Sequence, residues 1–188
     1  TTSRPASGLE HYFSHMWEMM ALERGEESDL HGIQVGVGCY LTFKLYEQIR
    51  KIKPDREKAL DFMRHFDEEK WESETRRVFG SVAEGIIATA KKEGRNDPAK
   101  HAERVNRIVD HWDEILKIMD EELPPFKTIV DIMTSCGMPM RPKDLGISDD
   151  DVRDALKASR DIRNKYLSST MLWDLGLLYD MADQFDGQ

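Results

Sequence analysis

The sequence is poor in cysteine, and its two cysteines are not close neighbours. Cys39 and Cys136 lie in opposite halves of the chain. This spacing argues against a disulfide framework and against a cysteine-based zinc site, which needs closely spaced pairs. We expect both residues to be buried free thiols. Such cysteine usage is typical of a protein of the reducing cytoplasm.

Long apolar runs and strand patterns are also scarce. No stretch approaches the ~20 apolar residues needed to span a bilayer, and the first ten residues, TTSRPASGLE, lack the apolar centre of a signal peptide. Sustained alternation of apolar and polar residues is missing, which argues against a β fold. Residue 1 is not Met, so we expect the natural protein to begin upstream.

Basic residues are outnumbered by acidic ones. The chain has 27 Lys and Arg against 36 Asp and Glu, a net charge of −9. This balance argues against a general nucleic-acid binder, which needs a basic face to displace counterions. It leaves room for a small local basic pocket that takes an anionic substrate.

Helical periodicity, by contrast, runs along the whole chain. It predicts one all-α domain over residues 1–188, with seven or eight helices and an extended loop at 138–147, MPMRPKDLGI. Asp97 before Pro98, and Ser148 before three aspartates, are strong helix starts. The expected helices cover residues 8–23, 31–53, 55–64, 67–92, 98–120, 125–136, 148–166 and 168–181.

Three histidines stand near the N-terminus. The stretch SGLEHYFSHMWEM, residues 7–19, holds His11 and His15, and HGIQVGVG begins with His31. Residues four apart share one face of a helix, so His11 and His15 project together. With His31 on the adjoining helix, the three could converge and bind Zn, Ni or Fe. The alternative is that they are ordinary, partly buried structural histidines.

Glycines follow the third histidine at an unusual density. Gly32, Gly36 and Gly38 fall within one helical stretch, where each costs about 1 kcal/mol relative to alanine. They indicate a packing or binding constraint. They do not form a dinucleotide-binding fingerprint, because no strand precedes them. The other histidines, His65, His101 and His111, we expect at the surface.

At these motifs the sequence resembles a known family. The patterns SG-x-EH-x-x-SH and HG-x-x-VGVG, together with residues 162–166 (IRNKY) and 171–176 (MLWDLG), resemble the metal-dependent polyol dehydrogenases. This superfamily includes iron-containing alcohol dehydrogenase, glycerol dehydrogenase and dehydroquinate synthase. Within it, the chain is most similar to sn-glycerol-1-phosphate dehydrogenases, nearly end to end.

The resemblance implies a two-domain enzyme of which this chain is the helical C-terminal domain, of the dehydroquinate synthase-like or iron-containing alcohol dehydrogenase type. The family's metal is held by one Asp and two His, which match His11 and His31 here. His15 matches a position that contacts substrate or relays a proton. NAD(P) and the acidic ligand would belong to an N-terminal domain that is absent from this chain, so we expect the chain alone to be inactive.

The implied reaction interconverts dihydroxyacetone phosphate and sn-glycerol 1-phosphate. A divalent metal, Zn, Ni or Fe, would act as a Lewis acid. Ser7 and Gly8 could offer backbone N–H groups to the substrate phosphate at the positive helix end. Glu10 and Glu18 could orient the histidines, or could be ordinary solvated charges.

Two alternatives stay open. The protein could be another superfamily member that acts on an unphosphorylated polyol or a sugar phosphate, or it could be a non-catalytic helical interaction domain. The expected partners are a small phosphorylated polyol or ketone and the missing N-terminal domain, with neither nucleic acid nor membrane. Apolar helix faces left open by that missing domain would favour a homodimer.

Overall fold

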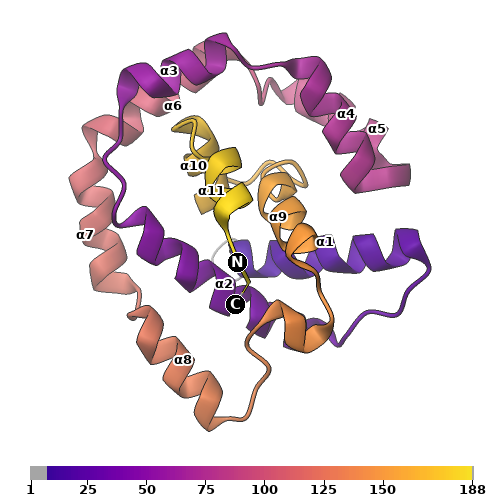
Figure 1. Cartoon of the computed structure of the whole chain (residues 1–188). Helices are drawn as coiled ribbons and strands as arrows, with labels where there is room; N and C mark the ends of the chain where they lie inside the picture. Colours follow the sequence, from indigo (N-terminus) through magenta and orange to yellow (C-terminus); the bar gives the residue numbers. More distant parts are fainter. Residues whose placement is uncertain (1–7, 188) are drawn as a thin grey trace, which may run out of the picture.

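The computed structural model describes residues 8–187, and this part of the chain is helical with no strand, so the predicted all-α class is confirmed. Figure 1 shows how the helices are arranged. The two short 3-10 segments are η2 (Gly80–Val82) and η3 (Pro142–Leu145). The α-helices are α1 (Leu9–Arg24), α2 (His31–Ile49), α3 (Arg56–Arg64), α4 (Glu68–Phe79), α5 (Ala83–Glu93), α6 (Pro98–Asp110), α7 (Trp112–Glu122), α8 (Phe126–Ser135), α9 (Asp149–Ala158), α10 (Ser168–Asp174) and α11 (Leu178–Gln184).

The described residues contain eleven α-helices rather than seven or eight, because three predicted helices are broken and the structure counts both pieces. Gly80 interrupts the predicted helix 67–92, and Gly176 separates α10 from α11. Both glycines have positive φ, 53° and 73°, which a continuing helix does not allow. His111 ends α6 and divides the predicted helix 98–120.

The predicted helix starts are well reproduced. The Asp97 side chain accepts hydrogen bonds from the N–H groups of Ala99 and Lys100, and the Ser148 hydroxyl accepts one from Asp151. Each satisfies donors that the first turn of a helix leaves without a partner. The helix that begins after Ser148 ends at Ala158, well before the predicted residue 166.

α1 and α2 form the centre of the core. They are joined by residues 25–30 and pack against one another, with Phe13, Met16 and Leu41 fully buried between the surrounding helices. Gly38 lets the two backbones meet, because a Cβ atom there would lie 2.4 Å from the carbonyl oxygen of Glu10. Gly36 faces the Met138 side chain, and Gly32 faces open space. Of the three glycines, only Gly38 meets a backbone.

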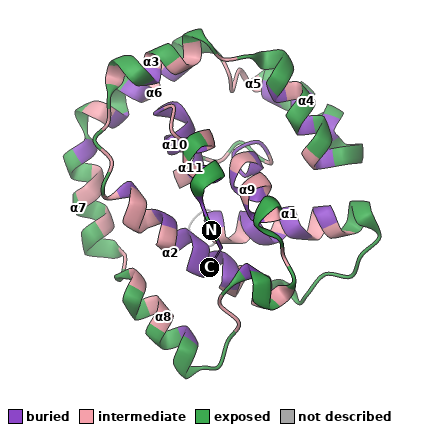
Figure 2. Cartoon of the chain, viewed as in Figure 1, coloured by how far each residue is buried: buried purple, intermediate pink, exposed green. Residues whose placement is uncertain are grey.

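The remaining helices curve around this centre. In Figure 1, α3 to α8 form an arc, and α9, α10 and α11 lie inside it. α9 packs against α1, and α11 packs against α9. Figure 2 shows α7 and α8 as largely exposed, and each buries a single residue, Trp112 and Met133.

Cysteine burial differs from the prediction. Cys39, on α2, is half-buried, but Cys136 is exposed, so the expectation of two buried thiols is wrong for Cys136. Cys136 caps the C-terminal end of the peripheral helix α8, which is largely exposed.

Within residues 8–187, no helix combines the length and apolar character needed to cross a bilayer.

Candidate functional site

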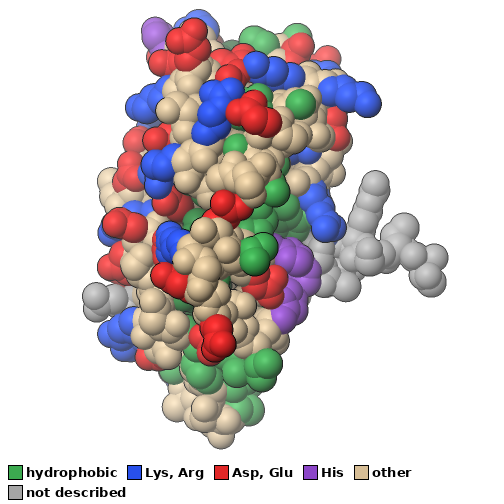
Figure 3. Space-filling model, turned by 90° about the vertical axis from the view of Figure 1, so that its right-hand side faces the viewer, with side chains coloured by type: hydrophobic (Ala, Val, Ile, Leu, Met, Phe, Trp, Pro, Cys, Tyr) green, Lys and Arg blue, Asp and Glu red, His purple; other side chains and the backbone are tan. Residues whose placement is uncertain are grey.

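The three N-terminal histidines converge at the surface. α1 supplies His11 and His15, and His31 is the first residue of α2. The ring centroid of His11 lies 4.3 Å from that of His15 and 4.8 Å from that of His31, and the His15 and His31 centroids are 5.6 Å apart. Figure 3 shows histidine side chains gathered in one patch beside acidic side chains. The predicted convergence is therefore confirmed.

Glu18 holds two of these rings from one side. Its Oε1 lies 2.7 Å from Nδ1 of His31, and its Oε2 lies 3.5 Å from Nδ1 of His15. An ionised carboxylate can only accept a hydrogen bond, so Nδ1 of His31 carries the proton. The lone pair of His31 is then on Nε2, which is the arrangement found when a carboxylate orients a metal-binding histidine. Glu18 thus takes up the orienting role predicted for it.

Two further polar residues support His31. Ser14 is fully buried, its Oγ lies 3.0 Å from Nδ1 of His31, and it donates a hydrogen bond to Oε1 of Gln34 at 3.0 Å. Neither residue was predicted from the sequence. A signal was present, because Ser14 precedes Glu18 by one helical turn and so shares its face.

Glu10 contacts the residue that precedes α1. Its Oε1 accepts a hydrogen bond from the backbone N–H of Gly8 at 2.8 Å. That N–H group, predicted to contact a substrate phosphate, therefore has an internal acceptor in this structure. Ser7, predicted to contact the same phosphate, lies outside the described residues.

The electrostatics favour neutral imidazole at His11. Burial lowers the pKa of His11, and the neighbouring rings of His15 and His31 lower it further. A metal ion binds the deprotonated ring nitrogen, so a lowered pKa favours the form of His11 that can bind a metal.

The histidine cluster fits part of a metal site. It contains imidazole nitrogens and a carboxylate that orients one of them, and its side chains are partly exposed, so that a ligand can reach them. Among residues 8–187, however, no group of three His, Cys, Asp or Glu side chains is placed so as to complete a metal site. A metal site that uses these histidines would therefore need a ligand from outside the described residues.

His101 is not at the surface as predicted. It is fully buried, and its Nε2 donates a hydrogen bond to the backbone carbonyl of Asp174 at 2.8 Å. Its ring lies against Phe62 and Trp173. His65 and His111 are exposed, as predicted.

Comparison with known proteins points to one enzyme name. No family model matches the chain, and no solved structure does. The glycerol-1-phosphate dehydrogenase [NAD(P)+] of Bacillus velezensis is 25% identical over 177 residues, which cover 94% of this chain and 32% of that protein. That of Halalkalibacterium halodurans is 27% identical over 163 residues, and that of Korarchaeum cryptofilum is 45% identical over 47 residues. The resemblance predicted from the motifs is confirmed.

This chain spans about a third of the length of the curated relatives that match most of it. The shorter Korarchaeum match covers 25% of this chain and 15% of that relative.

Proposed function

We propose that this chain is the metal- and substrate-binding part of an NAD(P)- and metal-dependent glycerol-1-phosphate dehydrogenase. The complete enzyme would interconvert dihydroxyacetone phosphate and sn-glycerol 1-phosphate. The observation that carries the proposal is the convergence of His11, His15 and His31 in front of Glu18. It occurs in a chain whose relatives over most of its length carry that enzyme name.

In this proposal His11 and His31 are metal ligands. The lowered pKa of His11 leaves a lone pair on its ring, and the hydrogen bond from Nδ1 of His31 to Glu18 leaves the lone pair of His31 on Nε2. The bound divalent ion, Zn, Ni or Fe, would supply Lewis-acid polarisation of the substrate carbonyl. We assign the acidic third ligand and the NAD(P) site to an N-terminal domain outside this chain. The chain alone is then expected to lack turnover.

His15 is the proposed substrate contact. Its ring lies against that of His11, and Glu18 lies 3.5 Å from its Nδ1, which leaves Nε2 for the substrate. Reduction of a ketone to an alcohol requires one proton at the new hydroxyl oxygen. His15 can hold that proton and donate it, as general acids do over hydrogen-bond distances.

The test is metal analysis and a reductase assay of the protein with its nucleotide-binding domain. We expect His11→Ala and His31→Ala to lose bound metal and activity together. His15→Asn should retain the bound metal and have a much lower kcat. His65→Ala is the matched control, because His65 is exposed and its Nδ1 lies 3.0 Å from a carbonyl of its own helix.

Two results would contradict the proposal. Unchanged metal content and activity in both His11→Ala and His31→Ala would make the histidines structural and favour a helical interaction domain. A kcat/KM for dihydroxyacetone equal to or above that for dihydroxyacetone phosphate would indicate an enzyme for unphosphorylated polyols.

A further inference from the structure

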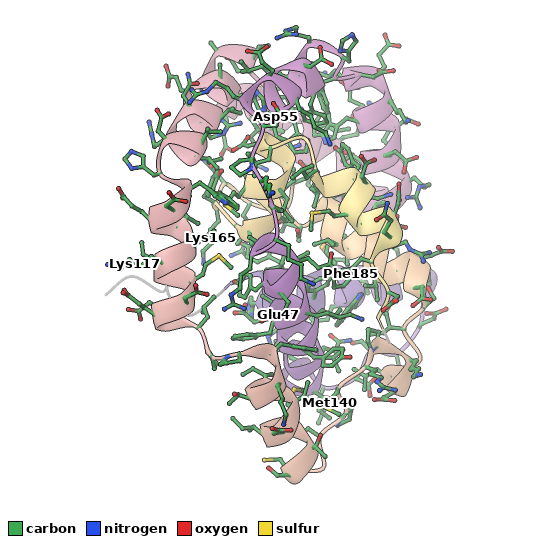
Figure 4. All side chains as sticks on the ribbon, turned by 60° about the vertical axis from the view of Figure 1, so that its left-hand side comes forward. Glu47, Asp55, Lys117, Met140, Lys165 and Phe185 are labelled. Atoms are coloured by element: carbon green, nitrogen blue, oxygen red, sulfur yellow. The ribbon has the colours of Figure 1, made fainter. Side chains whose placement is uncertain are left out.

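A cavity of about 210 Å³ lies between two segments that are far apart in the sequence. One segment is residues 93–104, at the end of α5 and the start of α6, and the other is residues 160–170, which follow α9. We call this cavity the basic pocket. Lys165, labelled in Figure 4, belongs to the second segment. The cations that line the pocket are Arg95, Lys100, Arg104, Arg160, Arg163 and Lys165.

The charge of the basic pocket is opposite to that of the chain. Six cationic side chains line it, and Glu93 is the only carboxylate among its described lining residues, in a protein of net charge −9. Three of these cations pair with carboxylates of the protein: Arg95 with Glu93, Arg104 with Asp174 and Arg160 with Asp161. The cations still outnumber the carboxylates, and like charges grouped together repel. A concave site of one sign also concentrates ligands of the opposite sign. The composition therefore points to an anionic ligand.

Several donors in the basic pocket have no protein acceptor. Arg163 is exposed, and its side chain makes no ion pair with the residues described. Arg160 is buried against the ring of Trp173, and its Nη1 lies 3.4 Å from Oδ1 of Asp161. Its Nε and Nη1 make no hydrogen bond of standard geometry with the described residues. Buried guanidinium donors without acceptors are costly, and phosphate oxygens satisfy such donors well.

The buried carboxylate of Asp174 holds two of the residues that line the basic pocket, Arg104 and Tyr166. Asp174 is fully buried and accepts hydrogen bonds from Nε of Arg104 at 2.9 Å and from the hydroxyl of Tyr166 at 2.8 Å. Arg95 is also fixed, because its Nη1 donates to the carbonyl of Asp161 at 2.6 Å. The pocket is thus held by contacts formed without a ligand, as expected of a preorganised site.

Tyr12 neighbours His15 and lies within electrostatic range of two cations of the basic pocket. Burial raises the pKa of Tyr12, and the charges of Arg163 and Arg95 oppose that rise, so both cations lie within electrostatic range of its phenol. The Tyr12 ring centroid is 6.5 Å from that of His15.

We propose that the basic pocket binds the phosphoryl group of a small phosphate monoester. That this ester is the enzyme's substrate rests on the proposed function. That the pocket binds a phosphoryl group does not depend on the proposed function. A phosphoryl dianion offers several acceptor oxygens to guanidinium groups. The volume is below the roughly 300–1,000 Å³ of pockets for drug-sized ligands, which excludes a whole dinucleotide. The pocket replaces the helix start at Gly8 as the phosphate site.

The test uses the 188-residue chain in the presence of a metal chelator, titrated calorimetrically with inorganic phosphate, with sn-glycerol 1-phosphate and with glycerol. We expect both phosphates to bind, glycerol not to bind, and affinity to fall with added salt. Arg163→Gln and Lys100→Gln should each weaken phosphate binding about tenfold, the loss of one charge-assisted contact. Arg64→Gln is the control, since Arg64 pairs with Asp61 and Glu57 on the exposed helix α3.

The outcomes separate this inference from the proposed function. Phosphate binding that is absent, or that is the same in Arg163→Gln, Lys100→Gln and the control, overturns the pocket even if the enzyme is an active dehydrogenase. Phosphate binding that the pocket variants lose, together with no reductase activity in the protein that includes its nucleotide-binding domain, supports the pocket and refutes the proposed function. In an active enzyme, Arg163→Gln should raise KM for dihydroxyacetone phosphate more than KM for dihydroxyacetone.

Discussion

Gly38 sits directly against the carbonyl group of Glu10, so closely that a Cβ atom at position 38 would be 2.4 Å from the carbonyl oxygen. This approach sets the spacing of α1 and α2. The same two helices carry the three histidines, so the distances between the histidines depend on a residue that has no side chain.

Replacing Gly38 with alanine should force the two helices apart. We expect Gly38→Ala to lower the free energy of unfolding by about 1–3 kcal/mol, the usual cost of overpacking, and to weaken metal binding. Gly32→Ala is the control on the same helix, since nothing lies within 4 Å of its Cβ position. There alanine should stabilise the protein by up to ~1 kcal/mol through helix propensity. Equal stability of the two variants would contradict the prediction.

Glu18→Gln should weaken the metal site without unfolding the protein. Loss of an orienting carboxylate typically lowers metal affinity about 10–100-fold, and Glu18 is partly exposed, so its neutral replacement needs no repacking. Glu27→Gln, in the exposed loop before α2, serves as control. The measurement is competition for Zn²⁺ with a chelating dye. Equal affinities in both variants would show that Glu18 does not act through His31.

His101 should make the protein less stable in mild acid. Burial lowers the pKa of its imidazole in the folded state, whereas in the unfolded chain it titrates near its ordinary value of about 6.5. Below about pH 6.5 the unfolded chain therefore binds more protons, and the free energy of unfolding falls as the pH falls. Urea unfolding of wild type and His101→Gln, with chelator present, should show stabilities that converge between about pH 7.5 and 5.5. A constant difference would refute the assignment.

Asp174→Asn should be far more damaging than loss of an exposed aspartate. The buried carboxylate pairs with Arg104 and accepts a hydrogen bond from Tyr166, so its loss leaves a partly buried cation unpaired. Such losses cost about 3–5 kcal/mol. Asp131→Asn, which removes an exposed pair with Lys127, should cost about 0.5 kcal/mol or less. Chemical unfolding of both variants measures the difference, and similar values would exclude a structural role for Asp174.

The two thiols should react at very different rates. Cys136 is exposed, whereas burial raises the pKa of Cys39 to about 11, so little of its reactive thiolate forms at neutral pH. A thiol reagent should label one cysteine rapidly and the other slowly, and Cys136→Ser should remove the rapid phase. Rapid labelling that persists in Cys136→Ser would place Cys39 in contact with solvent.

The histidine cluster could be predicted because its geometry is local. The i to i+4 spacing of His11 and His15 fixes their common face, and the short loop at residues 25–30 returns the chain to place His31 beside them. The helix starts at Asp97 and Ser148 could be predicted for the same reason, since a cap acts within one turn.

What could not be predicted depends on distant residues. His101 lies among charged neighbours in the sequence, yet it is buried by Trp173 and bonded to Asp174. The breaks at Gly80 and Gly176 were missed because an isolated glycine in a helical pattern is often tolerated. No spacing rule relates Arg95 to the carbonyl of Asp161, which become partners only in the folded chain.

This difference between local and distant contacts has a consequence for folding. The histidines require closure of one short loop, whose entropic cost is small, whereas the basic pocket requires segments far apart in the sequence to meet. Contacts of low sequence separation form early and survive partial opening of distant packing. A partly unfolded chain would therefore keep its histidine cluster longer than its basic pocket, and would lose phosphate binding before metal binding.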